Sequence, residues 1–313
     1  MKWSGKMEEL RTNIILETGT NEIGIMEFTI AGHVFGINVA KVREIMTYCP
    51  ITPMQKSHPA VEGVFKPRDV LMTVINLPKY LNLPESENRE KDIFIIADFN
   101  NMRVAFHVNT VVGIDRISWE AISKPDSTIY GGDEGIATGI AEYENRLITI
   151  LDFEKIVTDI SPNSGIKLSD LDYLGDRGRS EYPILIAEDS MLLSKLIIES
   201  LKKAGYVNVT ETNNGKEAWD FLSELKSYDE VEKHVACIIT DIEMPQMDGH
   251  RLIKLIRDDS KLRTIPVVIF SSLINEEMRI KGKQIGADEQ ISKPEIAKLV
   301  SIVDKLVGHR HLQ

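Results

Sequence analysis

The chain has 313 residues, of which 42% are hydrophobic and 27% are charged, and its formal net charge at pH 7 is -11. This composition argues against a disordered chain, and the acidic balance argues against binding of nucleic acid through a basic surface. No apolar stretch approaches the roughly 20 residues of a membrane-spanning helix, so we expect no insertion into a membrane. At about 100–200 residues per domain, the length predicts two domains.

The cysteines and the start of the chain indicate a cytoplasmic protein. Cys49 and Cys237 lie far apart in the sequence, and Cys237 stands in a strand-like apolar run, so reduced thiols are expected rather than a disulfide. The first residues, MKWSGKMEELRTN, carry acidic side chains where a signal peptide would have its apolar core. We therefore expect the chain to stay in the cytosol.

Residues 23–160 consist of short β-branched runs separated by turn residues, and we treat residues 1–22 as an N-terminal extension. Short runs with glycine, asparagine and proline between them predict an antiparallel β-sandwich or barrel. Two segments have helical features. Apolar residues recur at helical spacing in residues 37–46, INVAKVREIM, and residues 77–84, LPKYLNLP, are a short helical candidate bounded by prolines.

Residues 161–181 are rich in serine, glycine, aspartate and proline and are predicted to form a linker. In residues 182–313, apolar runs alternate with amphipathic segments, which predicts five strands and five helices. Ser190 is the expected N-cap of the first of these helices, and Gly205 lies beyond its end. Apolar strands with helical crossovers predict a doubly wound α/β domain with a parallel sheet covered on both faces.

Polar residues follow several of the predicted strands in the second domain. In doubly wound sheets the functional crevice lies outside the carboxyl ends of the strands. Each of these residues alone is more often a solvated loop or surface residue, but all stand at carboxyl ends, so we expect them to converge. They are Glu188 and Asp189 after the first strand, Asp241 after the third, Ser271 and Ser272 at the fourth, and Lys293 after the fifth.

The expected cluster has the residues needed for phosphoryl transfer. Three carboxylates in one crevice raise one another's pKa unless a cation holds them, and oxygen ligands suit Mg²⁺. A carboxylate can also be the nucleophile that forms an acyl phosphate, while an ammonium group and a hydroxyl contact the phosphoryl oxygens. In this scheme Asp241 is the acceptor, Glu188 and Asp189 bind the metal, and Lys293 and Ser271 contact the phosphoryl group.

Residues 182 to about 307 resemble the receiver domains of two-component signalling, through the segments PILIAEDS, IITDIEMPQMDG, PVVIFSS and ISKP. The resemblance implies that a histidine kinase phosphorylates Asp241. It also implies that the main-chain carbonyl of Glu243 joins the three carboxylates in binding Mg²⁺, and that Ser271 and Lys293 rearrange with the phosphoryl group.

Two positions depart from a common version of the receiver pattern. Gln290 stands where many receivers have a switching aromatic residue, which puts an aromatic rotamer switch in doubt. Glu243 places a carboxylate two residues after the acceptor, near the approach of an attacking water molecule. We hypothesise that the charge of Glu243 alters the lifetime of the phosphorylated state.

The first domain shows no basic recognition helix, Gly-rich phosphate loop or clustered metal ligands, and His33, His58 and His107 are predicted to be surface or strand histidines. It resembles the CheW family of chemotaxis coupling proteins, through EFTIAGHVFGINVAKVREIM, HPAVEGVFKPRDVLMTVINL, RVAFHVNTVVGIDRISWEAI and GIAEYENRLITILDFEKIV. The resemblance implies two small five-stranded barrels that bind chemoreceptor tips and a regulatory domain of the histidine kinase CheA.

Five residues match positions that contact partners in the CheW family. They are Val42 and Glu44 on the predicted short helix, Arg68, and Val111 and Ile114 after the HVN segment. Arg68 matches a frequent arginine of the family, although Asp69 replaces the usual glycine. The three apolar residues are equally compatible with the barrel core, whereas a buried arginine would need a paired anion.

The order of the two domains resembles that of CheV-type chemotaxis coupling proteins. The resemblance implies a non-enzymatic adaptor that associates with membrane receptor arrays through protein partners. Those partners are CheA, chemoreceptor tips and other coupling proteins. Phosphorylation at Asp241 is expected to regulate the coupling, with a role in adaptation.

Two alternatives stay open. The protein could be a phosphate sink that drains phosphoryl groups from CheA, which would use the same residues. An enzyme that uses Asp241 as a covalent nucleophile is the catalytic alternative; phosphatases of the haloacid-dehalogenase type have a second aspartate two residues later, where this chain has Glu243.

Overall fold

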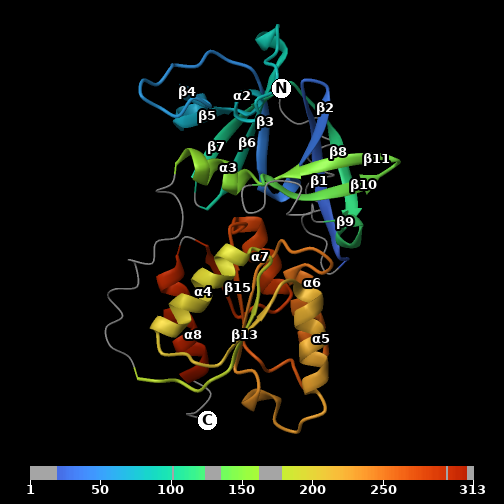
Figure 1. The fold of residues 1–313 in the computed structure, drawn as a ribbon, viewed down its shortest axis with the longest axis vertical. Coiled ribbons are helices and arrows are strands. Elements are labelled where there is room, and N and C mark those ends of the chain that lie inside the picture. Colours follow the sequence, from blue (N-terminus) through green and yellow to red (C-terminus); the bar gives the residue numbers. More distant parts are fainter. Residues whose placement is uncertain (1–19, 101, 124–134, 162–177, 294, 309–313) are drawn as a thin grey trace. The chain divides into compact units, whose positions relative to one another are not determined.

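The computed structural model describes residues 20–100, 102–123, 135–161, 178–293 and 295–308 (Figure 1). The chain forms two compact units, one mainly from Glu22–Ser164 and the other mainly from Gly165–Gln313. Most of the predicted N-terminal extension and most of the predicted linker lie outside the described residues. No helix in the part that the structure describes is both long enough and apolar enough to cross a bilayer.

The first unit contains two β-sheets. One has the order β8-β1-β2-β11-β10-β9 and the other the order β3-β6-β7-β5-β4. The first sheet consists of β1 (Glu22–Ile30), β2 (His33–Asn38), β8 (Thr110–Ser118), β9 (Ile122–Ser123), β10 (Ala137–Tyr143) and β11 (Arg146–Leu151). The second consists of β3 (Val42–Thr47), β4 (Val61–Phe65), β5 (Met72–Asn76), β6 (Ile93–Phe99) and β7 (Met102–Val108). Neighbouring strands are antiparallel except for β2 with β11 and β5 with β7.

Residues two apart on a strand share a face, so alternate residues of a strand enter the same core cluster. Ile148 and Ile150 belong to the core of the first sheet, and Phe94 and Ile96 to that of the second. The helix α3 (Phe153–Ile160) packs against a strand of each sheet. Its buried Phe153 ring lies 6.1 Å from that of Phe28 on β1 and 4.6 Å from that of Phe106 on β7.

The helix predicted for residues 37–46 is wrong. Only the 3₁₀ turn η1 (Val39–Lys41) is helical, and the chain continues as strand β3, which pairs with β6. The apolar spacing was compatible with a helix, but pairing with β6 hydrogen-bonds the backbone as a strand, so tertiary context overrides the local pattern. The predicted short helix at residues 77–84 is confirmed by α2 (Leu77–Tyr80), whereas α3 was not predicted.

The second unit has a parallel sheet in the order β13-β12-β14-β15-β16, as the alternating pattern predicted. This is the flavodoxin-like order of doubly wound folds. The strands are β12 (Ile184–Ala187), β13 (Val209–Thr212), β14 (Cys237–Thr240), β15 (Val267–Ser271) and β16 (Glu289–Ser292). The helices are α4 (Met191–Lys203), α5 (Gly215–Leu225), α6 (Gly249–Asp258), α7 (Glu276–Gln284) and α8 (Ile296–Gly308). Helices α4 and α8 lie on one side of the sheet, and α5 and α6 lie on the other (Figure 1).

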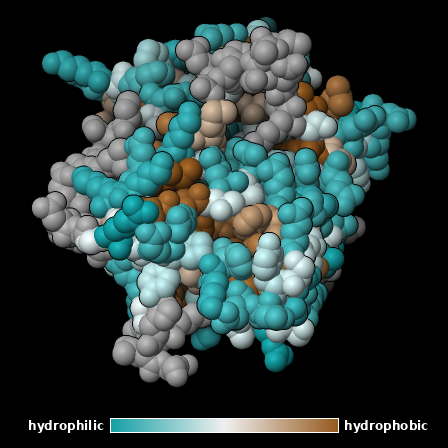
Figure 2. Space-filling model, turned by 60° about the horizontal axis from the view of Figure 1, so that its bottom comes forward, coloured by the Kyte–Doolittle hydropathy of each residue, from teal (hydrophilic) through white to brown (hydrophobic). Residues whose placement is uncertain are grey.

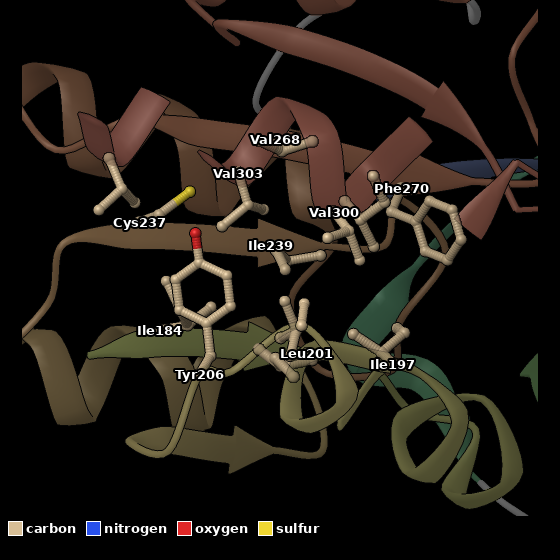
Figure 3. Packing of buried hydrophobic residues seen from close by; sticks show 14 of the residues in the cluster. Ile184, Ile197, Leu201, Tyr206, Cys237, Ile239, Val268, Phe270, Val300 and Val303 are labelled. Atoms are coloured by element: carbon tan, nitrogen blue, oxygen red, sulfur yellow. The ribbon is translucent and has the colours of Figure 1, made fainter. Parts of the chain in front are cut away.

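A buried apolar cluster fixes α4 and α8 on the sheet. Ile197 and Leu201 of α4 and Val303 of α8 point toward the strand residues Ile184 and Ile239 (Figure 3). The N-cap predicted for α4 is confirmed, since the Ser190 side chain accepts a hydrogen bond from the Leu193 amide. This packing holds the strands in fixed register, and their carboxyl ends therefore have fixed relative positions.

Candidate functional site

The polar residues predicted to converge in the second unit lie at the carboxyl ends of neighbouring parallel strands. Glu188 and Asp189 follow β12, and Asp241 follows the adjacent strand β14. One carboxylate oxygen from each of these three residues lies within 4.8 Å of the others. The structure therefore brings the acidic residues together as expected.

Asp241 is buried, with 4% of its surface exposed. Its Oδ1 accepts a 2.6 Å hydrogen bond from the Ile242 amide, and its Oδ2 lies 2.6 Å from Nζ of Lys293. Burial of an aspartate at the end of a strand is costly unless the charge is paired. Lys293 and the main-chain amide supply that pairing here.

Glu188 is buried, with 2% of its surface exposed. Its Oε1 accepts a hydrogen bond from the Ser190 amide, but its buried Oε2 has no hydrogen-bond partner, although Lys293 Nζ lies 3.3 Å away. Burial raises the pKa of Glu188 to about 8, and the charges of Asp241 and Asp189 add to this against the opposing effect of Lys293. The site therefore holds more negative charge than Lys293 compensates.

This excess of negative charge fits a bound divalent cation. The three carboxylates offer hard oxygen ligands, and the unpartnered Glu188 Oε2 is an acceptor that a cation could satisfy. Oxygen ligands of this kind suit Mg²⁺ and disfavour a soft metal that prefers thiolate or imidazole.

Ser271 and Lys293 complete the edge of the site. Ser271 ends β15, is fully buried and accepts a hydrogen bond at Oγ from the Leu273 amide. The Lys293 amide donates to the Ser271 carbonyl at 3.2 Å, which ties the end of β16 to the end of β15. Backbone pairing therefore fixes the point from which the Lys293 side chain reaches Asp241.

Gly249 is a site residue that sequence reasoning missed. A Cβ atom at Gly249 would lie 1.9 Å from the Asp241 carbonyl oxygen, and the Gly249 amide donates to the Ile242 carbonyl at 3.0 Å. The turn after Asp241 thus folds back so closely that only glycine fits. The glycine in MDG is the signal that could have identified it, because glycine is often used where the backbone must approach another group closely.

Glu243 and Gln290, which depart from the common receiver pattern, lie in different surroundings. Glu243 is partly exposed, two residues after Asp241. Gln290 does not join the acidic cluster, since its Nε2 donates to the Arg279 carbonyl of α7 at 2.9 Å. Its Oε1 is buried without a hydrogen-bond partner, and a Cβ atom on Gly282 would lie 2.4 Å from it.

The residues predicted to contact partners lie on both sheets of the first unit. Val42 on β3 is fully buried, which supports the core interpretation for that residue, whereas Glu44 on the same strand is half-buried. On β8, Ile114 is buried with 9% exposure and Val111 is half-buried. Strands β3 and β8 are edge strands of different sheets, so these four residues are divided between the two sheets.

Arg68 lies in the 3₁₀ turn η2 (Pro67–Asp69) between β4 and β5, and its side chain lies outside the described part of the structure. Asp69, which replaces the family's usual glycine, has φ of 71°. This is the left-handed region in which glycine is favoured and aspartate is among the better-tolerated residues. The turn therefore keeps a conformation that suits glycine.

Comparisons with known proteins match both units. The family model of the CheW-like domain matches residues 24–161, and that of the response regulator receiver domain matches residues 184–304. The chain is 29% identical over 300 residues to chemotaxis protein CheV3 of Helicobacter pylori, covering 92% of this chain and 95% of that protein.

Single-domain relatives match each half separately. Chemotaxis protein CheW of Thermotoga maritima is 28% identical over 151 residues, which are 48% of this chain and 98% of that protein. Chemotaxis protein CheY1 of Helicobacter pylori is 30% identical over 111 residues, which are 36% of this chain and 84% of that protein.

Proposed function

The chain belongs to the CheV type of chemotaxis proteins, with a CheW-like domain before a receiver domain, and we propose that it couples chemoreceptors to the kinase CheA under control of phosphorylation at Asp241. The coupling domain spans residues 23–160, and residues 161–181 link it to the receiver at residues 182–313. The protein acts in the cytoplasm, held at membrane receptor arrays by its partners. The observation that carries this proposal is the convergence of Asp241, Lys293 and two further carboxylates in a chain that also has a CheW-like domain.

Phosphorylation would proceed by attack of an Asp241 carboxylate oxygen on the phosphorus of a phosphohistidine. An O–P bond forms, the N–P bond breaks, and the donor imidazole leaves. Glu188, Asp189, Asp241 and the main-chain carbonyl of Glu243 would hold Mg²⁺, which neutralises charge on the phosphoryl oxygens. Asp241 has only 4% exposure, so little of its side chain is open to the donor.

Lys293 and Ser271 would stabilise the product. Lys293 now contacts Asp241 Oδ2, and after transfer its ammonium group can follow the charge onto a phosphoryl oxygen. Ser271 ends the adjacent strand β15, and its hydroxyl can donate to another phosphoryl oxygen. These shifts would start the change that the rest of the receiver transmits.

Regulation requires that the two receiver states interact differently with the coupling domain or with its partners. We propose that phosphorylation changes the affinity of the protein for the receptor and kinase, and that the result is adaptation, with reduced kinase output after stimulation. Glu44, Arg68, Val111 and Ile114 are the proposed contact residues. Val42 is less suited to this role, because its side chain has no exposed surface.

Co-sedimentation with receptor and CheA tests the proposal. Wild type, Asp241→Ala and the matched control Asp220→Ala, which changes an exposed aspartate on α5, are compared with and without phosphodonor. We expect phosphorylation to change the retention of wild type and Asp220→Ala but not that of Asp241→Ala. If retention never changes while Asp241 is still labelled, the linkage proposal fails and a phosphate sink is supported.

Labelling with a small phosphate ester separates the adaptor from the enzyme. The adaptor predicts at most one equivalent of acid-stable, base-labile label on Asp241, whereas an enzyme would complete many turnovers. Glu243→Gln tests the lifetime hypothesis in the same assay, with exposed Glu224→Gln on α5 as its matched control. An unchanged dephosphorylation rate in Glu243→Gln would exclude a role for that charge.

A further inference from the structure

His107 on β7 lies in a buried charge cluster of the coupling domain. Only 2% of its surface is exposed, and both of its ring nitrogens face carboxylates. Nδ1 lies 2.8 Å from Oε2 of Glu62 on β4, and Nε2 lies 3.0 Å from Oδ2 of Asp92, just before β6. We call Glu62, His107 and Asp92 the histidine clamp.

The geometry of the histidine clamp determines how many ring nitrogens of His107 must carry a hydrogen. An ionised carboxylate has no hydrogen to donate, so each of the two contacts needs a hydrogen on the ring. A neutral imidazole carries only one N–H, whereas the imidazolium carries two. With two ionised carboxylates, both contacts are therefore satisfied only when His107 is charged. Burial raises the pKa of Glu62, but the hydrogen bonds from His107 and Asn76 and the charges of His107 and Arg89 together lower it below its usual value.

In the part of the chain that the structure describes, two aromatic rings also lie close to the His107 ring. The Tyr48 ring centroid lies 5.5 Å away, and that of Phe94 on β6 lies 5.4 Å away, edge-on. The Tyr48 amide donates to the Asp92 carbonyl, which holds the segment after β3 against the clamp. The charged group Arg89 contacts the other carboxylate oxygen of Glu62, Oε1, and also pairs with Glu85.

Glu62 connects the histidine clamp to residues 81–92, the segment between α2 and β6. Arg89 Nη1 lies 3.1 Å from Oε1 of Glu62, and Arg89 also pairs with Glu85. Nδ2 of Asn76, at the end of β5, donates to both Glu62 and Glu85. Asp92 ends the same segment, so the clamp holds it at both Arg89 and Asp92.

We propose that the histidine clamp attaches residues 81–92 to strands β4 and β7 while both ring nitrogens of His107 are protonated. The attachment weakens when His107 loses one of these protons. In the neutral ring one nitrogen lone pair would face a carboxylate lone pair at about 3 Å, and that contact would open. If Glu62 separates from His107, the Arg89–Glu62 pair is no longer tied to β7. If Asp92 separates from His107, the end of the segment loses its attachment to β7. The coupling domain thereby gains a pH-sensitive element that does not depend on Asp241.

Nitrogen NMR of the full chain labelled with ¹⁵N-histidine tests the protonation state, with the His107 signals assigned by their loss in His107→Gln. We expect two N–H nitrogens of imidazolium type at neutral pH. One pyridine-like nitrogen, the mark of a neutral ring, would overturn the proposal.

The conservative variant Glu62→Gln tests whether loss of the His107 proton releases residues 81–92. In Glu62→Gln the amide nitrogen can donate to His107 Nδ1 while its oxygen accepts from Asn76 and Arg89, so a neutral ring satisfies both contacts. We measure hydrogen exchange of residues 81–92 in the full chain against pH. Glu87→Gln, an exposed change in the same segment, is the matched control.

Opening of the histidine clamp releases one proton. The fraction of wild-type molecules with an open clamp should therefore rise by up to about tenfold per pH unit once the His107 ring begins to deprotonate. We expect the ratio of exchange in wild type to exchange in Glu62→Gln to rise with pH, since the intrinsic pH dependence of exchange cancels. Glu87→Gln should follow wild type. A ratio that is independent of pH would overturn the proposal. If Glu62→Gln does not fold, Asp92→Asn provides the mirror arrangement with the same expected result.

Discussion

The two domains both bury a basic side chain between two carboxylates, but they do so with different outcomes. In the receiver, Lys293 lies between Asp241 and Glu188. In the coupling domain, His107 lies between Glu62 and Asp92. The receiver adds a third carboxylate, Asp189, and leaves a buried Glu188 oxygen without a hydrogen bond.

In the histidine clamp of the coupling domain, by contrast, none of the three side chains has a buried polar atom without a hydrogen-bond partner. Figure 2 shows one face of the molecule, on which apolar residues are scattered among hydrophilic ones. The comparison teaches that a buried basic side chain between carboxylates does not by itself indicate a reaction site. Uncompensated charge and an unpartnered oxygen distinguish the site that can take up a cation and a phosphoryl group.

The largest expected effect comes from removing each of these two basic side chains. Lys293→Met and His107→Leu should each lower the free energy of unfolding of their own domain by about 3–5 kcal/mol, since two carboxylates are left facing each other. Only the receiver should recover stability on addition of Mg²⁺. Hydrogen exchange of core strands, read separately for each domain with and without Mg²⁺, measures this. Equal responses of the two variants to Mg²⁺ would remove the distinction.

A smaller effect is expected at the turn that positions Asp241. Gly249→Ala should destabilise the receiver by about 1–3 kcal/mol, because the new methyl group would overlap the Asp241 carbonyl and the backbone must shift. Gly113→Ala on β8 of the coupling domain is the matched control, since nothing lies within 4 Å of its Cβ position. Urea unfolding of each variant, together with the rate of Asp241 labelling, checks both. Normal labelling in Gly249→Ala would mean that the turn does not position the acceptor.

The buried histidines of the two domains should respond to pH in opposite directions. Burial lowers the pKa of His250 on α6 to about 3, with a further contribution from Lys281. In the unfolded chain a histidine takes up its proton near pH 6.5. The receiver should therefore lose stability as the pH falls below about 6.5, by up to about 1.4 kcal/mol per pH unit, whereas the histidine clamp weakens as the pH rises.

His250→Leu should flatten the acid side of this dependence. The buried Nε2 of His250 has no hydrogen-bond partner, so an apolar side chain of similar size leaves no partner unpaired at that atom. Domain-resolved hydrogen exchange between pH 5 and pH 7 measures the slope. An unchanged slope would show that other groups cause it.

The smallest effect is expected for a charge pair on the surface. Asp220→Asn removes the pairing with Lys216 on α5, where both side chains are about half exposed. Water and salt screen such pairs, so the change in free energy of unfolding should be about 0.5 kcal/mol or less. Thermal unfolding of this variant sets the baseline for the larger effects. A loss comparable to that of Lys293→Met would contradict the assignment of the large effects to burial.

The fold of the receiver was predictable because its pattern is local. Apolar runs of four or five residues and amphipathic segments specify parallel strands with helical crossovers, and this topology alone places the strand ends together. The convergence of Glu188, Asp241 and Lys293 followed from strand order. The first domain was less predictable, since β3 has apolar spacing that also fits a helix and only its pairing with β6 decides between them.

By itself, the sequence determined the two-domain organisation, the α/β class of the second domain and the residues at its strand ends. Only the tertiary structure decided the unpartnered Glu188 oxygen, the close approach at Gly249 and the burial of His107 between carboxylates from two other segments. The physical reason is that strand periodicity and capping depend on neighbours along the chain. Desolvation and charge pairing depend on groups that are distant in sequence and meet only after folding.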